Sequence, residues 1–396
     1  MEEAIKYMAE ITAAPLMYGR RIQKETGRRV VGYVCSYTPE EIIIAAGAHP
    51  LRLFGPMGEL ECVDTHLQSY CCSVVRGILE TGLKGDADFL AGMVFPHTCD
   101  SIQRLSDLWR INVTHGFHLD LVLPVKLNTD SARKYYLDVL RRFRMELGKK
   151  LGVDIGDEAL RKAYETLREI RRLLAGIYEL RSANPTLLSG DDLLTIVKAA
   201  MIMDRREASD LLQRVATGLK AKIEAHKSLP ESVNSSPPQE KEIKRLVLAG
   251  GICNHPRLHG MIEAAGGAVV WDDMCTGARY FQTAGPGIES DGSTAAGKGD
   301  TMAAIAERYL NREVCPAKHN GLTSRAEAII SLVREKQARG VILLHLKFCD
   351  PHAFDYPYLK NALDRENIPH LMLEIEDPLP AEGQLRTRFE AFLEMF

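Results

Sequence analysis

VILLHLKFCDPH, residues 341–352, is the most informative segment of the chain. Its first half, Val341 to Leu346, is an unbroken apolar run with branched side chains, which predicts a strand buried in a parallel sheet. Cys349, Asp350 and His352 then fall in the loop beyond the carboxyl end of that strand. In open α/β sheets, ligands bind at this edge. The segment therefore predicts an α/β protein with its site at the strand ends.

Cysteines follow other predicted strands in the same way. The pairs are residues 29–34 with Cys35, 89–95 with Cys99, 268–271 with Cys275, 341–346 with Cys349, and 246–249 with Cys253. A single cysteine is more often a small buried hydrophobe than a ligand. Five at strand ends are harder to explain by packing, because a loop beyond a strand is not where apolar packing is most needed. Iron–sulfur clusters are held by thiolates that need not be close in sequence if strand ends converge.

Composition narrows the class of protein. A chain of 396 residues, 45% of them hydrophobic, is too long for one ordinary α/β domain and predicts two or three. The net charge of -3 shows no excess of basic residues of the kind that indicates nucleic-acid binding. The start, Met1 to Glu3, is not a basic signal sequence, and no apolar run has transmembrane length. We therefore expect a cytoplasmic protein without a membrane segment, in which nine cysteines do not serve as disulfides.

The order of predicted elements divides the chain into five parts. They are a helical lead-in at 1–27, an N-terminal α/β lobe at 28–128, a helical region at 129–226, a linker at 227–244 and a C-terminal α/β lobe at 245–396. Strands are predicted at 29–34, 50–54, 86–95, 119–125, 246–249, 268–271, 341–346 and 369–375. The two lobes show a weak internal similarity, because Cys99-Asp100 and Cys349-Asp350 each follow a predicted strand at a comparable position in their lobe. This suggests two similar lobes facing a shared cleft.

The helical region contains one clear amphipathic stripe. Apolar residues recur at 160, 163, 167, 170, 174 and 177, and the pattern stops at Asn184-Pro185. The region is interpreted either as a lid or docking surface or, in preference, as a helical bundle packed on the first lobe.

Two local helix starts bear on the cysteines. Thr38 is predicted to cap a helix whose first residue is Pro39, which would place Cys35 close to the positive end of a helix dipole. A second helix is predicted to begin near Tyr70 and to carry Cys71 and Cys72.

Other motifs are weaker. Residues 292–299, GSTAAGKG, nearly match a phosphate-binding P-loop, but Gly299 replaces the required Ser or Thr and no strand precedes the loop. Compact CxxC spacings are absent, which disfavours structural zinc. Four histidines lie near cysteines and are candidate proton donors, although a hydrogen-bonded structural role is commoner for each. They are His97, His255, His319 and His352.

Six segments together resemble the 2-hydroxyacyl-CoA dehydratase and benzoyl-CoA reductase superfamily. They are VVGYVCSYTPEEIIIAAGAHPLRL, LQSYCCSVVRGILETGL, DFLAGMVFPHTCD, DDMCTGARYF, GVILLHLKFCDPHAFDYPYLKNAL and GQLRTRFEAFLEMF, and the resemblance runs from about residue 15 to the end. It implies two flavodoxin-like lobes with a [4Fe–4S]-type cluster between them. It also implies a dimer with an identical or related subunit, and electrons from a separate iron–sulfur activator protein that hydrolyses ATP.

The resemblance also implies the cluster ligands. The superfamily's dehydratases hold one cluster with three cysteines, which map onto Cys72, Cys99 and Cys349. Three more cysteines stand in family-like segments: Cys35, Cys275 and Cys315. Six thiolates, grouped along the sequence as 35, 72, 99 and 275, 315, 349, resemble the branch with a double-cubane [8Fe–9S] cluster. The remaining cysteines at 62, 71 and 253 are then not ligands.

Three functions follow as hypotheses. The first is an iron–sulfur reductase that receives low-potential electrons from the activator and reduces a small substrate, with His97 and His352 supplying protons. The second is a single-cluster [4Fe–4S] subunit of a 2-hydroxyacyl-CoA dehydratase, which is a hydro-lyase, or of a benzoyl-CoA reductase, acting on a CoA thioester. The third is a non-catalytic electron carrier.

Overall fold

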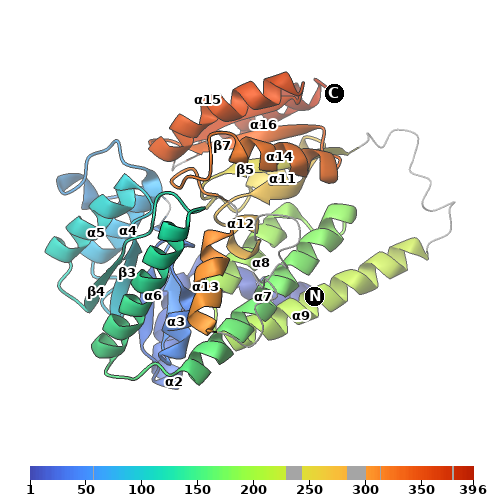
Figure 1. The fold of residues 1–396 in the computed structure, drawn as a ribbon. Coiled ribbons are helices and arrows are strands. Elements are labelled where there is room, and N and C mark those ends of the chain that lie inside the picture. Colours follow the sequence, from blue (N-terminus) through green and yellow to red (C-terminus); the bar gives the residue numbers. More distant parts are fainter. Residues whose placement is uncertain (57, 229–242, 283–299, 313, 377–378) are drawn as a thin grey trace.

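The structure is a computed structural model that describes residues 1–56, 58–228, 243–282, 300–312, 314–376 and 379–396 (Figure 1). The near P-loop at 292–299 and most of the predicted linker at 227–244 lie outside these residues.

Two four-stranded parallel sheets form the framework. Their strands, in spatial order, are β2 (His49–Arg52), β1 (Val30–Tyr33), β3 (Gly92–Pro96) and β4 (Phe117–Leu121) in the first sheet, and β6 (Gly267–Asp273), β5 (Lys244–Gly250), β7 (Gly340–Leu346) and β8 (His370–Ile375) in the second. Each sheet has the order 2-1-3-4 counted along its own strands, the beginning of the flavodoxin-like order. The prediction of two flavodoxin-like lobes with parallel sheets is confirmed.

All eight predicted strands are present, but some of their bounds shift. The third was predicted at 86–95, whereas β3 is Gly92–Pro96 and residues 86–91 form turns. Gly85 adopts a positive φ of 76°, and the amide of Asp88 donates back to its carbonyl, so the backbone cannot extend there. The predicted strand 119–125 is β4, Phe117–Leu121.

Helices cover both sheets and fill the space between the lobes. Their bounds are α1 (Glu2–Ala13), α2 (Pro15–Thr26), α3 (Glu40–Ala45), α4 (Ser73–Leu83), α5 (Asp100–Asn112), α6 (Asp130–Leu151), α7 (Asp157–Ala183), α8 (Gly190–Ile202), α9 (Arg205–Lys227), α11 (Leu258–Ala264), α12 (Ala278–Phe281), α13 (Thr301–Leu310), α14 (Ser324–Glu335), α15 (Asp350–Arg365) and α16 (Glu382–Leu393), with a short 3-10 helix at Val63–Thr65. None of the helices described is long and apolar enough to cross a membrane.

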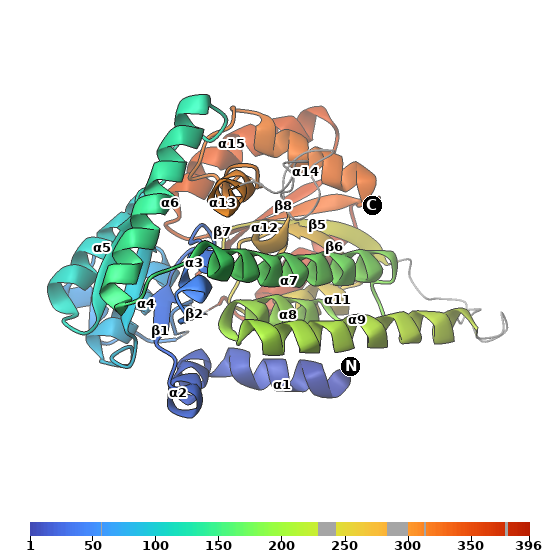
Figure 2. The same ribbon diagram turned by 60° about the horizontal axis from the view of Figure 1, so that its bottom comes forward.

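The amphipathic stripe of the helical region is confirmed in α7. All six of its predicted apolar positions are buried, and the helix ends at Ala183, before Asn184-Pro185. The favoured interpretation, a bundle packed on the first lobe, is incomplete. Helix α7 contacts α3 of the first lobe and also β6 of the second, and Figure 2 shows α7 and α8 running below the second sheet. The helical region therefore joins the lobes.

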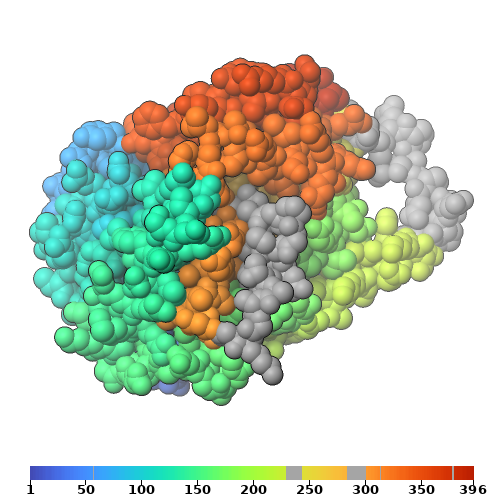
Figure 3. Space-filling view, in the orientation of Figure 1, coloured from blue at the N-terminus to red at the C-terminus, as the bar shows by residue number. Residues whose placement is uncertain are grey.

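The second half of the chain also reaches back to the first lobe. Helix α13 packs on α6 and α7, away from the sheet that precedes it in sequence (Figure 1). In the space-filling view the C-terminal lobe, orange and red, lies directly on the first lobe and the middle helices (Figure 3).

Buried ion pairs fix α3 between these parts. Glu40 accepts hydrogen bonds from Arg205 at the start of α9, and Glu41 pairs with Arg171 of α7. The Tyr309 hydroxyl of α13 donates to Glu41 over 3.1 Å. Breaking such a pair leaves an uncompensated buried charge, so these contacts oppose separation of the lobes. They hold the loop at residues 35–38 in place.

Candidate functional site

Three cysteines occupy the N-cap positions of described α-helices. Cys72 precedes α4, Cys99 precedes α5 and Cys349 precedes α15. The prediction that a helix begins near Tyr70 and includes Cys72 is wrong, because Cys72 has an extended ψ of 145° and the helix begins one residue later. The sulfurs therefore stand at the positive ends of three helix dipoles.

These three thiols interact with one another although they come from both lobes. Burial is the main cause that raises the pKa of each to about 12. A neighbouring thiol adds to this in every case: Cys99 acts on Cys72, Cys349 on Cys99, and Cys72 on Cys349. First-turn amides, such as that of Val75 beside Cys72, lower the pKa and partly offset burial. We call Cys72, Cys99 and Cys349 the first triad.

The other three predicted cysteines form a second group. A hydrogen bond between Cys275 and Cys315 lowers the pKa of Cys275 well below its ordinary value and raises that of Cys315. Cys315 also interacts electrostatically with Cys35, whose sulfur lies 3.6 Å from the Thr98 hydroxyl. We call Cys35, Cys275 and Cys315 the second triad.

The two triads adjoin. Cys99 interacts with Cys35, and Cys349 with Cys275. All six predicted cysteines are thus brought together, at the carboxyl edges of both sheets. The spatial grouping differs from the grouping along the sequence, because each triad combines residues of both halves of the chain.

The helix start beside Cys35 also differs from the prediction. Pro39, not Thr38, is the N-cap of α3, and the Thr38 hydroxyl has no partner among the described residues. The Thr38 carbonyl instead accepts a hydrogen bond from Tyr309 over 2.8 Å. Because α3 begins at Glu40, Cys35 lies five residues before it and is not a capping residue.

Buried arginines surround the second triad. Their place beside these cysteines was not predicted from the sequence. Arg52 donates from Nη1 to the Cys275 carbonyl over 3.0 Å, and Arg312 donates to the Ser36 carbonyl over 2.5 Å. Arg279 donates to the Gly250 carbonyl. The positive charges of all three arginines lower the pKa of Cys275. Arginine is usually a surface residue, so no sequence signal marked them as part of a buried site.

These arginines differ in whether a carboxylate neutralises their charge. Arg279 pairs with Asp273 over 3.2 Å, and Asp273 also pairs with Arg325. Arg52 and Arg312 have no carboxylate partner in the described part of the chain. Taking unpaired cations out of water is costly, which favours an anionic group beside them.

The donor set consists of thiols from both lobes, and thiolates are the usual protein ligands of iron–sulfur clusters. Six adjoining thiols beside unpaired cations match the chemistry of such an anionic group.

A cleft of about 440 Å³ opens next to Cys99. It is lined by charged residues of both lobes, including Asp100 of the first and Lys318 of the second, and by apolar residues such as Phe354. The Phe354 side chain is exposed at this cleft. This cleft is large enough for a small organic molecule, and it contacts Cys99, one of the predicted site cysteines.

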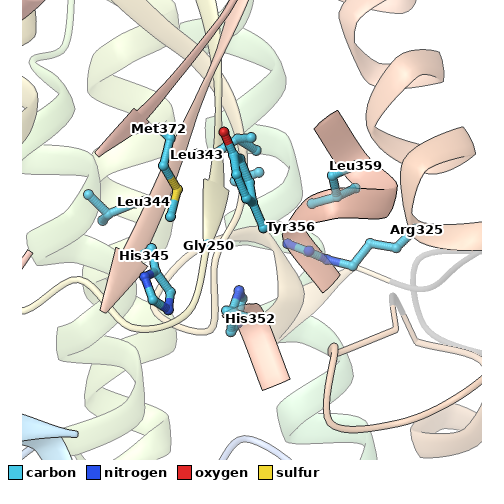
Figure 4. Close-up of a pocket in the computed structure, with 10 residues that line it drawn as sticks. Gly250, Arg325, Leu343, Leu344, His345, His352, Tyr356, Leu359 and Met372 are labelled. Atoms are coloured by element: carbon cyan, nitrogen blue, oxygen red, sulfur yellow. The ribbon is translucent and has the colours of Figure 1, made fainter. Parts of the chain in front are cut away.

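The two predicted proton donors lie in different places. His97 lines the cleft, and its Nε2 lies 2.8 Å from Asp120 Oδ1. His352 lies in a small pocket of about 20 Å³ with His345, Tyr356 and Arg325, shown in Figure 4. Burial, then the charge of Arg325, holds the pKa of His352 well below its ordinary value.

The remaining cysteines and histidines lie outside the two triads. Cys253 is buried, which raises its pKa to about 11, and its sulfur donates weakly to the His255 carbonyl over 3.8 Å. Cys71 neighbours Cys72 but is half-buried and raised in pKa mainly by burial. His319 lines the cleft.

Fold and site together define a two-lobed α/β protein whose site is assembled from both halves of the chain. The chain belongs to the family described as 2-hydroxyglutaryl-CoA dehydratase, D-component, whose model matches residues 35–396. The resemblance seen in the sequence is thereby confirmed.

Curated relatives match along nearly their whole length. The (R)-phenyllactyl-CoA dehydratase beta subunit of Clostridium sporogenes is 27% identical over 385 residues, covering 97% of this chain and 96% of the relative. A benzoyl-CoA reductase subunit of Thauera aromatica is 28% identical, with 88% and 86% covered. The beta subunit of (R)-2-hydroxyglutaryl-CoA dehydratase of Acidaminococcus fermentans is 25% identical, with 94% and 93% covered. These relatives are dehydratase and reductase subunits, which supports an enzyme.

Proposed function

We propose that this protein is an iron–sulfur reductase that accepts single low-potential electrons from an ATP-hydrolysing iron–sulfur activator protein and reduces a small substrate. The observation that supports it most strongly is the convergence of six cysteines from both lobes beside buried, unpaired arginines. A double-cubane [8Fe–9S] cluster would require six protein thiolates, three on each half.

We propose that each triad holds one half of this double-cubane cluster. Cys72, Cys99 and Cys349 would bind one, with the N-termini of α4, α5 and α15 directing their positive ends at the sulfurs. The second triad would bind the other, with arginines compensating its charge. When bound, such a cluster supplies low-potential electrons one at a time.

The cleft is the proposed substrate site. Its volume suits a small molecule better than a complete CoA thioester, and its wall includes Cys99 of the first triad. His97 stands in the same wall, with Asp120 orienting its ring, and is the first candidate to deliver a proton. His352 lies in a different pocket, behind Arg325, which lines both cavities, so its contribution would be indirect.

The partners are also proposals. ATP hydrolysis is assigned to the activator and not to this chain. The relatives are named as parts of larger enzymes, which favours a dimer with an identical or related chain. A site that needs reduced thiols suits the cytoplasm.

The second candidate is a single [4Fe–4S] enzyme subunit acting on a CoA thioester, as a 2-hydroxyacyl-CoA dehydratase or benzoyl-CoA reductase. The names of the relatives favour it, as does the mutual interaction of the first triad. Reduction or dehydration of a substrate when activator and ATP are supplied would separate both candidates from a non-catalytic electron carrier.

Replacement of second-triad cysteines separates the first two candidates. We expect Cys275→Ala and Cys315→Ala to lose about half of the bound iron, because each removes one of the three thiolates that hold one half. Cys253→Ala is the control, since Cys253 is a buried thiol in the same lobe that has no described interaction with either triad. Iron is measured per folded chain after anaerobic purification. Wild-type iron content in Cys275→Ala would support the single cluster instead.

A further inference from the structure

Arg52 and Arg312 are buried cations without a described counter-ion. Their side chains are 0% and 2% exposed, and within the described residues neither forms a salt bridge. Arg52 donates to the Met201 sulfur and to the Cys275 carbonyl, and its Nε and Nη2 have no partner in the same part of the chain. The Arg312 guanidinium lies 4.3 Å above the Tyr37 ring, donates to Ser36 and leaves its Nε unpartnered there.

Both arginines are anchored at the second triad. Arg52 is tied to the backbone of Cys275, and Arg312 to the residue that follows Cys35. Arg312 also donates to the Arg279 carbonyl, which connects it to the helix following Cys275. The positions of these two charges are therefore set by the same backbone segments that carry the cysteines.

The negative charge of the first triad's thiolates is compensated in a different way. Its sulfurs face helix N-termini, each equivalent to roughly half an elementary charge. Of the buried arginines around the second triad, only Arg279 is a described electrostatic neighbour of a first-triad thiol, Cys349. The second triad is next to the whole charges of Arg52 and Arg312, which are themselves buried, and charges interact more strongly where the dielectric is low. The two halves of the site are therefore electrostatically unequal.

We infer that Arg52 and Arg312 give the second-triad half of the proposed cofactor the higher reduction potential, so that incoming electrons are stored there and reach the first-triad half beside the cleft afterwards. The inference rests on the proposed double-cubane function. An added electron increases negative charge, and nearby fixed cations stabilise the reduced state. The cluster, if bound by these cysteines, would take up one electron in each step from the iron–sulfur activator, which would be oxidised in turn, and no proton or leaving group would move.

Substitutions that remove or keep the charge test this inference. Arg52→Met and Arg312→Met delete the cation and keep much of the side-chain length, whereas Arg52→Lys and Arg312→Lys keep the cation. Arg308→Met is the matched control: Arg308 is 2% exposed and has two nitrogens without a described partner, but its described electrostatic neighbours include no thiol. Iron and sulfide per chain are measured first, because a wild-type protein without iron would overturn the proposed function itself.

The decisive readout is an anaerobic titration of iron-loaded protein with Ti(III) citrate, which is oxidised to Ti(IV), followed by electron paramagnetic resonance. We expect both Met variants to shift the first reduction step to a more negative potential and to leave the second step in place. The Lys variants and Arg308→Met should titrate like the wild type. If a Met variant loses iron while its Lys variant keeps it, charge compensation is supported.

Two results would overturn the inference while leaving the proposed function intact. One is an unchanged first step in Arg52→Met and Arg312→Met at full iron content. The other is loss of iron from the Met and Lys variants alike, which would assign both arginines a packing role only.

Discussion

His49 is a buried side chain that makes the free energy of unfolding depend on pH. It lies in β2, and its Nε2 is 2.8 Å from the Ile202 carbonyl at the end of α8. Burial, then the charge of Arg205, lowers the pKa of His49 to about 3. In the unfolded chain a histidine has a pKa of about 6.5.

The difference predicts a loss of stability in acid. Below about pH 6.5 the unfolded chain takes up a proton that folded His49 does not, so the free energy of unfolding falls as pH falls. His49→Gln should reduce this slope between pH 6 and 4 by up to about 1.4 kcal/mol per pH unit. Urea denaturation at several pH values measures it. An identical slope in the variant would contradict a neutral, buried His49.

At the scale of residues, the sequence predicted the thiols but not their surroundings. Cysteines at strand ends stood out because the pattern recurred, and the structure brings those at 35, 99, 275 and 349 together. Arg52 and Arg312 gave no such signal, since their burial results from contacts between residues more than 200 positions apart. Only the fold shows that these charges are unpaired and near sulfur.

Helix α7 carries the contacts between the lobes at the scale of elements. Leu174 lies on its buried stripe and is fully buried. Leu174→Ala should lower the free energy of unfolding by about 2–5 kcal/mol, through lost apolar burial and a residual cavity. Met145→Ala on α6 is the control, because Met145 is largely exposed. Denaturant titration of both variants tests this, and equal effects would show that the stripe is not a core.

Element types were more predictable than element ends. The stripe of α7 and the apolar run of β7 follow from periodicity, which depends on many residues at once. The starts of α3 and α4 were misplaced because single dihedral angles decide them: the N-caps Pro39 and Cys72 have non-helical ψ angles of 88° and 145°. Tertiary contacts, such as Tyr309 with the Thr38 carbonyl, selected these conformations and leave no local pattern.

At the scale of the whole molecule, two sheets of identical strand order place their carboxyl edges around one site. This arrangement explains why the chain needs both halves to assemble either triad. The two lobes could be predicted from the alternation of strands and helices, together with the family resemblance. The joining role of the helical region could not, because an amphipathic stripe indicates that a face is buried but not against what.

The central claim is that six cysteines hold one double-cubane cluster, and iron analysis tests it most directly. Iron and acid-labile sulfide are measured per chain on protein purified and reconstituted without oxygen. A double-cubane cluster on these cysteines predicts about eight irons with slightly more sulfide than iron. About four irons would contradict the double cubane and favour the single cluster on the first triad. A reproducible absence of iron would contradict both.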